Sequence, residues 1–407
     1  MTTTEEPIGR VASAERFAGI TVVRDGDGYV LGNAATGEYV IVPEIGGQVM
    51  LWLKDGVAVA ECADRAEQYA GEPVNVAGFV DGLVAAGVLQ PADAAADSPV
   101  PDSEGPARWQ ARLGRILFGR AGLVVQAGLA VTAVVAMVLV PSVRLAYTDL
   151  IVGPVPLVSL VTVTLLGLAS GLVHECAHVL AAAAKGVRGR VTISRRLLSL
   201  AYQTDLTALW GLPRRDRIVP LSAGMLSDAA TVGVLAVVQL LWVRDLSSPA
   251  GHLLRALLFL KATGIVVQLQ VYMRTDVYAL FVVATRCRNL WDTKGALARR
   301  AIGRATAADL TLLASVGRRD IVCGRIYLLL YIPGVTWTVW YFSAYGVPST
   351  YRIATMAVHA VRDAGVLSAS GAAGVAALCL MAVTTTILLR GLVRAATQLV
   401  RQIVVRS

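Results

Sequence analysis

The stretch "PLVSLVTVTLLGLASGLVHECAHVLAAAA", residues Pro156–Ala184, decides the fold of this protein. From residue 150 to residue 184 the only charged residues and histidines are His174, Glu175 and His178. A run of this length and composition is typical of a helix that crosses a lipid bilayer. Charged residues and histidines are costly at membrane depth, so those that occur there are candidates for function. The stretch therefore predicts a membrane helix that carries a functional site.

The composition of the whole chain agrees with a membrane protein. Of its 407 residues, 56% are hydrophobic and 16% are charged, and the mean hydropathy is +0.62. We expect an α-helical integral membrane protein with about six transmembrane helices, of which the second and the fourth are long enough to tilt, kink or break. The predicted spans are Gly122–Val140, Pro156–Ala184, Ile218–Val243, Leu253–Thr285, Ile321–Tyr345 and Val366–Leu389.

Charge divides the chain into two parts. Residues 1–105 hold 17 Asp or Glu against 5 Lys or Arg, a net charge of −12, whereas residues 106–407 hold 11 against 32, a net charge of +21. This asymmetry predicts an acidic soluble domain joined to a basic membrane domain. An acidic domain repels a phosphate backbone, so no nucleic-acid partner is expected. The predicted parts are a tail (1–16), a soluble domain (17–90), a linker rich in Ala, Pro, Asp and Ser (91–107) and a membrane domain (108–407).

The distribution of basic residues predicts the orientation. Lys and Arg accumulate on the cytoplasmic side of membrane proteins. Beyond residue 105, 25 of them lie in segments that face the cytoplasm if the N-terminus is inside, against 5 in the other connections. The first 17 residues lack the basic and apolar regions of a cleaved signal peptide. We expect a multi-pass protein of the cell membrane with both termini cytoplasmic.

The connection between the second and third predicted spans, residues 185–217, is more than a plain loop. Its sequence "VRGRVTISRRLLSLAYQTDLTALWGLPRRDR" mixes β-branched and apolar residues with glycine and basic clusters. A solvated basic loop would account for the arginines but not for the apolar middle. The pattern predicts a hairpin or an interfacial segment on the cytoplasmic face.

The spacing of the two histidines in this predicted helix predicts a metal site. Residues i and i+4 share one face of a helix, so His174 and His178 can both direct imidazole nitrogens to one metal ion. Glu175 lies beside them, where it could accept a proton. This H-E-x-x-H arrangement is typical of zinc hydrolases. The alternative is a set of polar residues that hydrogen-bond between helices.

A catalytic zinc ion takes three protein ligands, so a third must come from elsewhere. His252 and His359, the only other histidines, fall at the predicted outer ends of helices. Asp276 lies ten residues before the basic cluster at Arg286, and His174 lies eleven before Lys185, which places both about 15–16 Å below the cytoplasmic surface. Asp276 is therefore the preferred third ligand, unless it forms a salt bridge with Arg274 or Lys261.

A second aspartate, Asp228, is eleven residues after Arg217 in the third predicted span. Its depth below the surface is close to that of Asp276, so depth alone does not exclude it as the ligand. We rank it second.

These segments together resemble a known family. The sequences "HECAH", "SAGMLSD" (Ser222–Asp228) and "RTDVY" (Arg274–Tyr278) are similar to the landmarks of the site-2 protease family, the M50 intramembrane zinc metallopeptidases, over roughly residues 150–285. Where that family has L-D-G and G-P-x-x-N, this chain has T-D-V and G-M-L-S-D. The resemblance implies a Zn²⁺ cofactor held by His174, His178 and Asp276, with Glu175 as the general base.

The soluble domain carries a second resemblance. "ITVVRDGDGYVLGNAATGEYVIVP" (Ile20–Pro43) predicts short antiparallel strands, and three helical stretches follow it. This order, over about residues 17–90, resembles the PqqD-like domain, a winged-helix-like α+β module that recognises leader peptides of ribosomally made, modified peptides. The resemblance implies that an extended peptide binds by strand addition to a sheet edge. The matching positions are Glu38, Tyr39, Val40 and Ile41 of the strand, and Phe79 and Leu83 of the last helix.

For Phe79 and Leu83 individually, a place in the core of the soluble domain is the alternative to peptide binding, because apolar residues of this size are usually buried.

Together these features predict a zinc metalloendopeptidase of the lipid bilayer that acts on a precursor or leader peptide read by its N-terminal domain. One alternative is a non-catalytic membrane protein for export of, or immunity to, a modified peptide, in which Lys261, Gln268 and Gln270 line a polar path. Another is regulated cleavage of a membrane-bound signalling protein, in which case the substrate is a membrane protein.

Overall fold

The structure is a computed structural model that describes residues 16–33, 36–91, 105–196, 199–242, 245–270 and 274–404. Most of these residues are helical, and within them six helices are long and apolar enough to cross a membrane. The N-terminal domain combines a three-stranded sheet with helices. The predicted fold class is confirmed. The predicted tail and most of the predicted linker lie outside the described residues.

The N-terminal domain is built on an antiparallel sheet of β1 (Ile20–Asp25), β2 (Gly28–Asn33) and β3 (Glu38–Pro43), in the order β1-β2-β3. β1 and β2 are joined by two residues, of which Gly26 has a φ of 72°. Two-residue hairpin turns need positive φ angles, which glycine adopts without strain. Within the described residues, β1 and β3 each pair with β2 alone, so the outer edge of β3 is one of two unpaired edges of this sheet.

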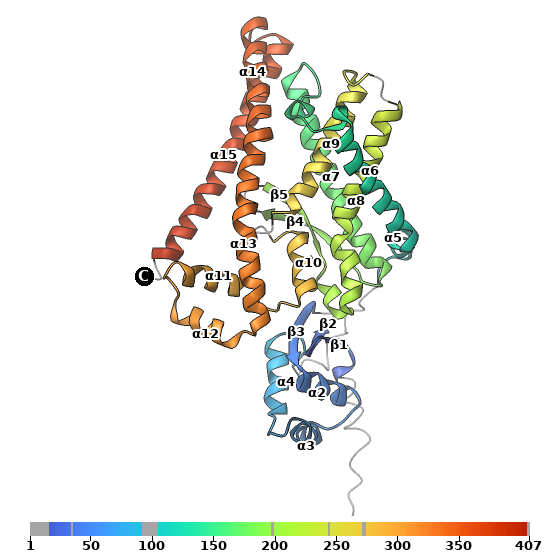
Figure 1. The fold of residues 1–407 in the computed structure, drawn as a ribbon, viewed down its shortest axis with the longest axis vertical. Coiled ribbons are helices and arrows are strands. Elements are labelled where there is room, and N and C mark those ends of the chain that lie inside the picture. The colour runs from blue at the N-terminus through green and yellow to red at the C-terminus, as the bar shows by residue number, and fades with distance from the viewer. Residues whose placement is uncertain are drawn as a thin grey trace, which may run out of the picture. The chain divides into compact units, whose positions relative to one another are not determined.

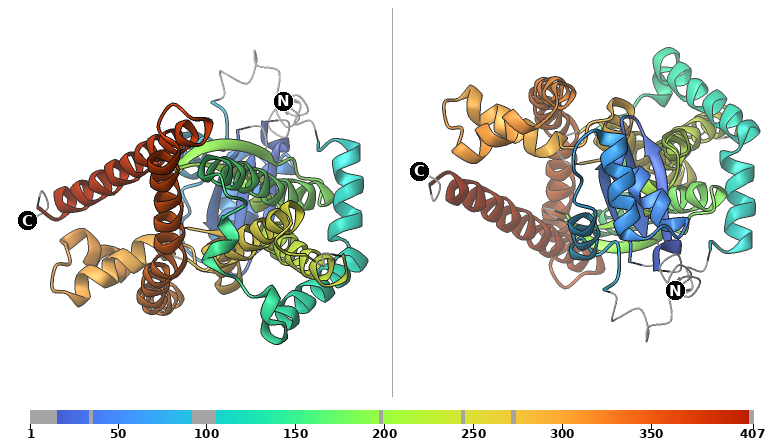
Figure 2. Two further views of the ribbon diagram at one scale, coloured as in Figure 1. Left: turned by 90° about the horizontal axis from the view of Figure 1, so that it is seen from above. Right: turned by 90° about the horizontal axis from the view of Figure 1, so that it is seen from below.

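Three helices follow the sheet: α2 (Glu44–Lys54), α3 (Val59–Ala70) and α4 (Val76–Ala85). α2 lies across one face of the sheet (Figures 1 and 2). α3 ends at Gly71, whose φ is 74°, and α4 is capped by Asn75, whose side chain accepts a hydrogen bond from the backbone N–H of Gly78 at 2.8 Å. The core between helices and sheet includes Phe17, Leu31, Val49, Met50, Leu53 and Leu83.

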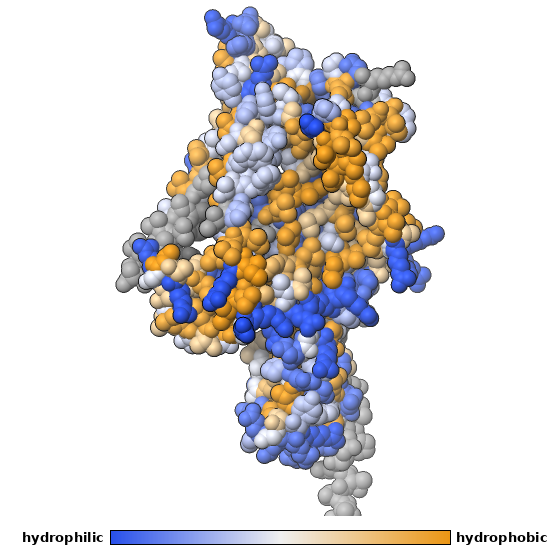
Figure 3. Space-filling model, in the orientation of Figure 1, coloured by the Kyte–Doolittle hydropathy of each residue, from blue (hydrophilic) through white to orange (hydrophobic). Residues whose placement is uncertain are grey.

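The first long helices are α6 (Arg120–Leu139), α7 (Pro156–Ala184), α8 (Arg214–Trp242) and α9 (Pro249–Gln268), preceded by the short α5 (Arg108–Phe118). Two 3₁₀ turns, η2 (Pro141–Val143) and η3 (Tyr147–Leu150), connect α6 to α7. Only 17% of the apolar window of α6 and 11% of that of α7 is buried. Figure 3 shows apolar residues gathered over the outer surfaces of the long helices. Apolar surface of this extent facing outward suits contact with lipid.

The fourth predicted span is broken. The hydropathy pattern predicts a helix over Leu253–Thr285 that is long enough to break, and the structure ends α9 at Gln268 and begins a separate α10 at Asp276, extending to Thr285. Arg274, just before α10, has a φ of 53°, a left-handed conformation that cannot continue an α-helix. The break places Asp276 at the start of a helix instead of its middle.

Two short helices, α11 (Leu290–Ala301) and α12 (Ala307–Ser315), lead to α13 (Arg318–Tyr341). α13 passes through a π-helical turn, Phe342–Gly346, into α14 (Val347–Ala364). The fifth predicted span, Ile321–Tyr345, is therefore part of a continuous helical run of 47 residues.

The chain ends in α15 (Ala369–Val404), which turns back beside α14 (Figures 1 and 2). The last predicted span, Val366–Leu389, lies mostly within α15, which continues beyond it to Val404.

The predicted hairpin between the second and third spans is confirmed. β4 (Arg190–Arg196) pairs with β5 (Ser199–Asp205) in a two-stranded sheet, and a 3₁₀ turn, η4 (Thr207–Gly211), follows. η4 contacts all three strands of the N-terminal sheet. Tyr39 of β3 lies against Gly211, whereas its neighbours Val40 and Val42 pack into the domain core. Because side chains alternate along a strand, η4 covers the face of the sheet opposite α2.

Candidate metal site

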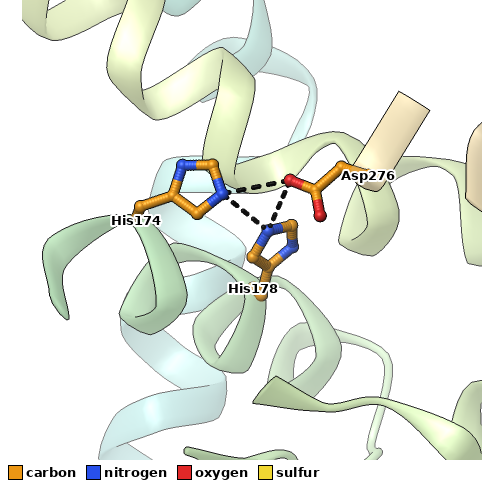
Figure 4. Close-up of side chains that lie close together, drawn as sticks. All are labelled: His174, His178 and Asp276. Carbon is orange, nitrogen blue, oxygen red and sulfur yellow. Dashed lines mark hydrogen bonds and ion pairs between the residues drawn. The ribbon is translucent and has the colours of Figure 1, made fainter. Parts of the chain in front are cut away.

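α7 brings two imidazole rings to one place. His174 and His178 lie one helical turn apart, and both are buried, with 7% and 3% of their surface exposed. Their Nε2 atoms are 3.3 Å apart. Figure 4 shows the two rings directed toward one another and toward Asp276. As predicted, the two histidine side chains lie on the same face of α7.

Asp276 completes a group of three. Its Oδ2 atom lies 3.0 Å from Nε2 of His174 and 3.1 Å from Nε2 of His178. Asp276 does not pair with Arg274 or Lys261, the two salt-bridge partners considered from the sequence. The break between α9 and α10 therefore directs this carboxylate to the histidines.

Gln268 connects the end of α9 to the start of α10 by hydrogen bonds. Its side-chain Oε1 accepts a hydrogen bond from the backbone N–H of Asp276 at 3.1 Å, and its backbone oxygen accepts one from the Thr275 hydroxyl at 2.6 Å. Its Nε2 lies 3.3 Å from Nε2 of His174. The side chain that ends α9 thus fixes the start of α10 against the ring of a candidate ligand.

The three side chains fit a divalent metal ion. Two imidazoles and one carboxylate, each offering one atom, form the group. Ligands bound at about 2.0–2.1 Å in a tetrahedral arrangement are roughly 3.3 Å apart. The distances of 3.0, 3.1 and 3.3 Å between the three atoms are close to that spacing. Two histidines and one carboxylate leave a fourth position for substrate or water, as catalytic sites require.

A glycine in α8 makes room for the group. A Cβ atom at Gly224 would come well inside van der Waals contact with Nε2 of both His174 and His178. Gly224 is the glycine of the "GMLSD" segment. Because Gly224 has no side chain, the space next to the Nε2 atoms of both rings stays free.

Asp228, the second choice for third ligand, lies on the far side of His174. Its Oδ2 is 2.7 Å from Nδ1 of His174, and its Oδ1 is 2.5 Å from Nζ of Lys261. Nζ of Lys261 also donates to the backbone oxygen of Ser170 at 2.9 Å. A carboxylate on Nδ1 fixes the proton there and leaves the lone pair of Nε2 for a metal. Asp228 therefore supports a ligand instead of joining the group.

Glu175 is held by the hairpin. Its Oε2 accepts hydrogen bonds from the backbone N–H of Thr204 at 2.9 Å and from the Thr204 hydroxyl at 2.7 Å. The same hydroxyl lies 3.2 Å from the backbone oxygen of Glu175. Thr204 is the penultimate residue of β5, so the strand orients the carboxylate of the candidate general base.

Part of this site follows from the sequence. The sequence predicts the two histidines and Asp276, and it shows Lys261 and Gln268 as polar residues of the fourth span. It does not predict Thr204, because nothing in the sequence shows which hairpin residue meets α7. His252 lies apart, with its Nδ1 3.0 Å from the backbone oxygen of Val152.

The residues predicted to bind peptide divide between surface and core. In β3, Glu38 and Ile41 are exposed, while Tyr39 and Val40 are half-buried. In α4, Leu83 is buried in the domain core and Phe79 packs against that core half-buried. The open edge of β3 keeps strand addition geometrically available.

No protein-family model, curated protein or solved structure matches this chain. The family resemblance therefore rests on the sequence segments quoted above.

Proposed function

We propose that this protein is a metal-dependent peptidase of the membrane, of the site-2 protease type, with Zn²⁺ as its cofactor. The observation that carries the proposal is the group of His174, His178 and Asp276, whose ligand atoms lie 3.0–3.3 Å apart. Glu175 is next to His174 in the chain. Buried histidines and carboxylates at this depth are otherwise unfavourable. A bound metal accounts for all three at once.

Each residue has a separate task in this proposal. A zinc ion, when bound, supplies a Lewis acid that polarises a peptide carbonyl and lowers the pKa of water toward about 7. Glu175 takes the proton from the attacking water and delivers it to the leaving amine. Asp228 keeps the Nδ1 proton of His174 in place, and Lys261 balances the charge of Asp228.

We further propose that the substrate is a precursor or leader peptide read by the N-terminal domain from the cytoplasmic side. The open edge of β3, with exposed Ile41, supports this assignment. The topology with both termini cytoplasmic belongs to the same proposal.

Metal content and cleavage together test the function. The full-length protein is purified in detergent with His178→Ala and Glu175→Gln variants, and bound metal is measured by mass spectrometry. We expect about one zinc per chain in the wild type and in Glu175→Gln, and none in His178→Ala. Cleavage of a mixture of apolar fluorogenic peptides is expected from the wild type alone. A Glu175→Gln variant that still cleaves excludes this mechanism, and a wild type without metal favours the non-catalytic alternative.

A further inference from the structure

Two basic side chains share one indole ring outside the group of metal ligands. The guanidinium carbon of Arg274 lies 4.1 Å from the centre of the Trp291 ring, and Nζ of Lys294 lies 3.6 Å from it. Nζ of Lys294 is also 5.2 Å from the ring of Tyr331. Cations are attracted to the faces of aromatic rings. Both positive charges therefore contact the same indole ring.

The two charges have no ion-pair partner in the part of the chain that the structure describes. Among the described residues, no carboxylate lies within ion-pair distance of Arg274 or Lys294. Arg299, on the same helix as Lys294, does pair with Asp309, at 2.5 Å. Burial and the charges of Arg274 and Arg299 lower the pKa of Lys294, and nearby Asp292 offsets this only in part. Like charges held this close repel one another, and a bound anion would relieve the repulsion.

The backbone around the two cations also favours an anion. Arg274 adopts a φ of 53°, a conformation unfavourable for a residue with a side chain. Trp291 lies in the first turn of α11, whose N-cap residue, Asn289, makes no side-chain capping hydrogen bond. The first turn of a helix carries a partial positive charge that adds to the field of nearby cations.

The position of the two cations indicates what the anion is. Arg274 lies two residues before Asp276, so their Cα atoms are at most about 7 Å apart. An extended peptide advances about 3.3–3.4 Å per residue. A peptide bond placed at the candidate metal site therefore has residues only a few positions away within reach of Arg274. The planar guanidinium of arginine matches a carboxylate with two parallel hydrogen bonds.

We propose that Arg274, Trp291 and Lys294 form a subsite that binds a carboxylate of the peptide substrate, close to the bond that is cut. This inference rests on the proposed peptidase function and adds a substrate preference to it. The carboxylate is either an acidic side chain or the free C-terminus of the peptide.

Binding of defined peptides tests the subsite without cleavage. The protein is the full-length Glu175→Gln variant in detergent, and the probes are fluorescent twelve-residue peptides of Ala and Leu. One peptide carries a central Glu and an amidated C-terminus, the second a central Gln and an amidated C-terminus, and the third a central Gln and a free C-terminus. We expect the first or the third to bind roughly tenfold more tightly than the second, as one charge-assisted contact allows. Equal binding of all three overturns the proposal.

Matched variants assign the preference to residues. Lys294→Gln and Arg274→Gln are expected to remove most of the tenfold difference, whereas Lys294→Arg keeps it. Arg300→Gln removes one charge from the exposed side of the same helix and is the control for net charge. Arg274 is exposed, so its variant provides the test if Lys294→Gln does not fold.

Two results distinguish a carboxylate subsite from a general effect of surface charge and from a lipid-binding site. If Arg300→Gln loses the preference as fully as Lys294→Gln, general surface charge is responsible and the subsite is wrong. If Lys294→Gln only lowers the amount of phosphatidylglycerol that copurifies, the cluster binds a lipid headgroup and the proposal is overturned. Because the readout is peptide binding and not cleavage, a carboxylate preference in a protein that proves to hold no zinc would contradict the proposed function alone.

Discussion

Asp276 and Asp228 lie on opposite sides of the His174 ring, and their substitutions should separate the two roles. Asp276→Asn replaces an anionic oxygen in the ligand group, so we expect zinc to be lost from the purified protein. Asp228→Asn keeps all three candidate ligands and changes the partner of His174 Nδ1 and of Lys261, so we expect zinc affinity to fall by about 10–100-fold with stoichiometry recoverable at high zinc. The measurement is a zinc titration with a competing chelator. Loss of metal in Asp228→Asn with full retention in Asp276→Asn would reverse the assignment.

Gly224 should tolerate no side chain at all. Gly224→Ala places a methyl group against Nε2 of both candidate histidine ligands, so we expect the variant to fold but to bind no zinc. Gly167→Ala, in α7, is the matched control, because a Cβ atom there meets nothing within 4 Å. The control is expected to stabilise its helix by up to about 1 kcal/mol. Normal zinc content in Gly224→Ala would show that the metal does not sit between these rings.

Individual residues differ in how far the sequence predicts them. His174 and His178 follow from their spacing on one helix, whereas depth below the surface ranks Asp276 first without excluding Asp228. The role of Gly224 cannot be read in this way, because a missing atom matters only when its neighbours are known. The role of Thr204 is even harder to predict from the sequence, because its contact with Glu175 depends on how a strand is positioned along a helix.

At the scale of single elements, the pair of Lys261 and Asp228 joins α9 to α8 beside the site. Lys261→Met leaves the Asp228 carboxylate buried with no cation, which lowers the free energy of unfolding by about 3–5 kcal/mol. Removing both charges of a buried pair often leaves the free energy of unfolding nearly unchanged. We therefore expect the double variant Asp228→Asn/Lys261→Met to have a higher unfolding temperature than Lys261→Met alone. Thermal unfolding of the wild type, both single variants and the double variant measures the coupling. Additive effects would mean that the two charges do not interact.

The contact of the hairpin residue Thr204 with Glu175 should affect the activity of this candidate general base. Thr204→Val keeps the backbone hydrogen bond to Glu175 and removes the hydroxyl one, and a hydrogen bond to a charged group contributes about 1.5–3 kcal/mol. We expect kcat to fall at least about tenfold with KM little changed, and Thr204→Ser to restore it. Zinc content is the control and should stay constant in both variants. A change confined to KM would place Thr204 in substrate binding instead.

The elements themselves follow from the sequence to different degrees. The strands and helices of the N-terminal domain and the β4–β5 hairpin are predicted because alternation and glycine turns are local signals. The break after Gln268 is visible only as excess length, since hydropathy averages over the polar residues that cause it. The run from Arg318 to Ala364 exceeds its prediction because its second half is less apolar, so hydropathy alone places the end too early.

At the scale of the whole molecule, the N-terminal domain makes an ion pair with the start of α8. Arg217, at the start of α8, is 1% exposed, and its guanidinium donates to the Asp25 carboxylate at 2.8 Å and to the backbone oxygen of Trp210 at 3.1 Å. It also lies 4.8 Å from the centre of the Trp210 ring. Deleting the domain would remove the carboxylate that pairs with Arg217, so we expect a deletion to alter the start of α8 as well as to remove the domain.

A single substitution isolates that attachment. Asp25→Asn keeps the domain but leaves Arg217 uncompensated, at a cost of about 3–5 kcal/mol for a buried pair. We expect amide hydrogen exchange to rise in η4 and β1, by up to about a hundredfold, while α3 and the core helices of the domain stay protected. Asp81→Asn, an exposed position on α4, is the control. If the domain reads the substrate, the same variant should weaken binding of a precursor less than loss of the domain would, because the variant keeps the whole domain on the chain. Unchanged exchange in η4 would show that the attachment depends on the apolar contacts of the sheet and not on this ion pair.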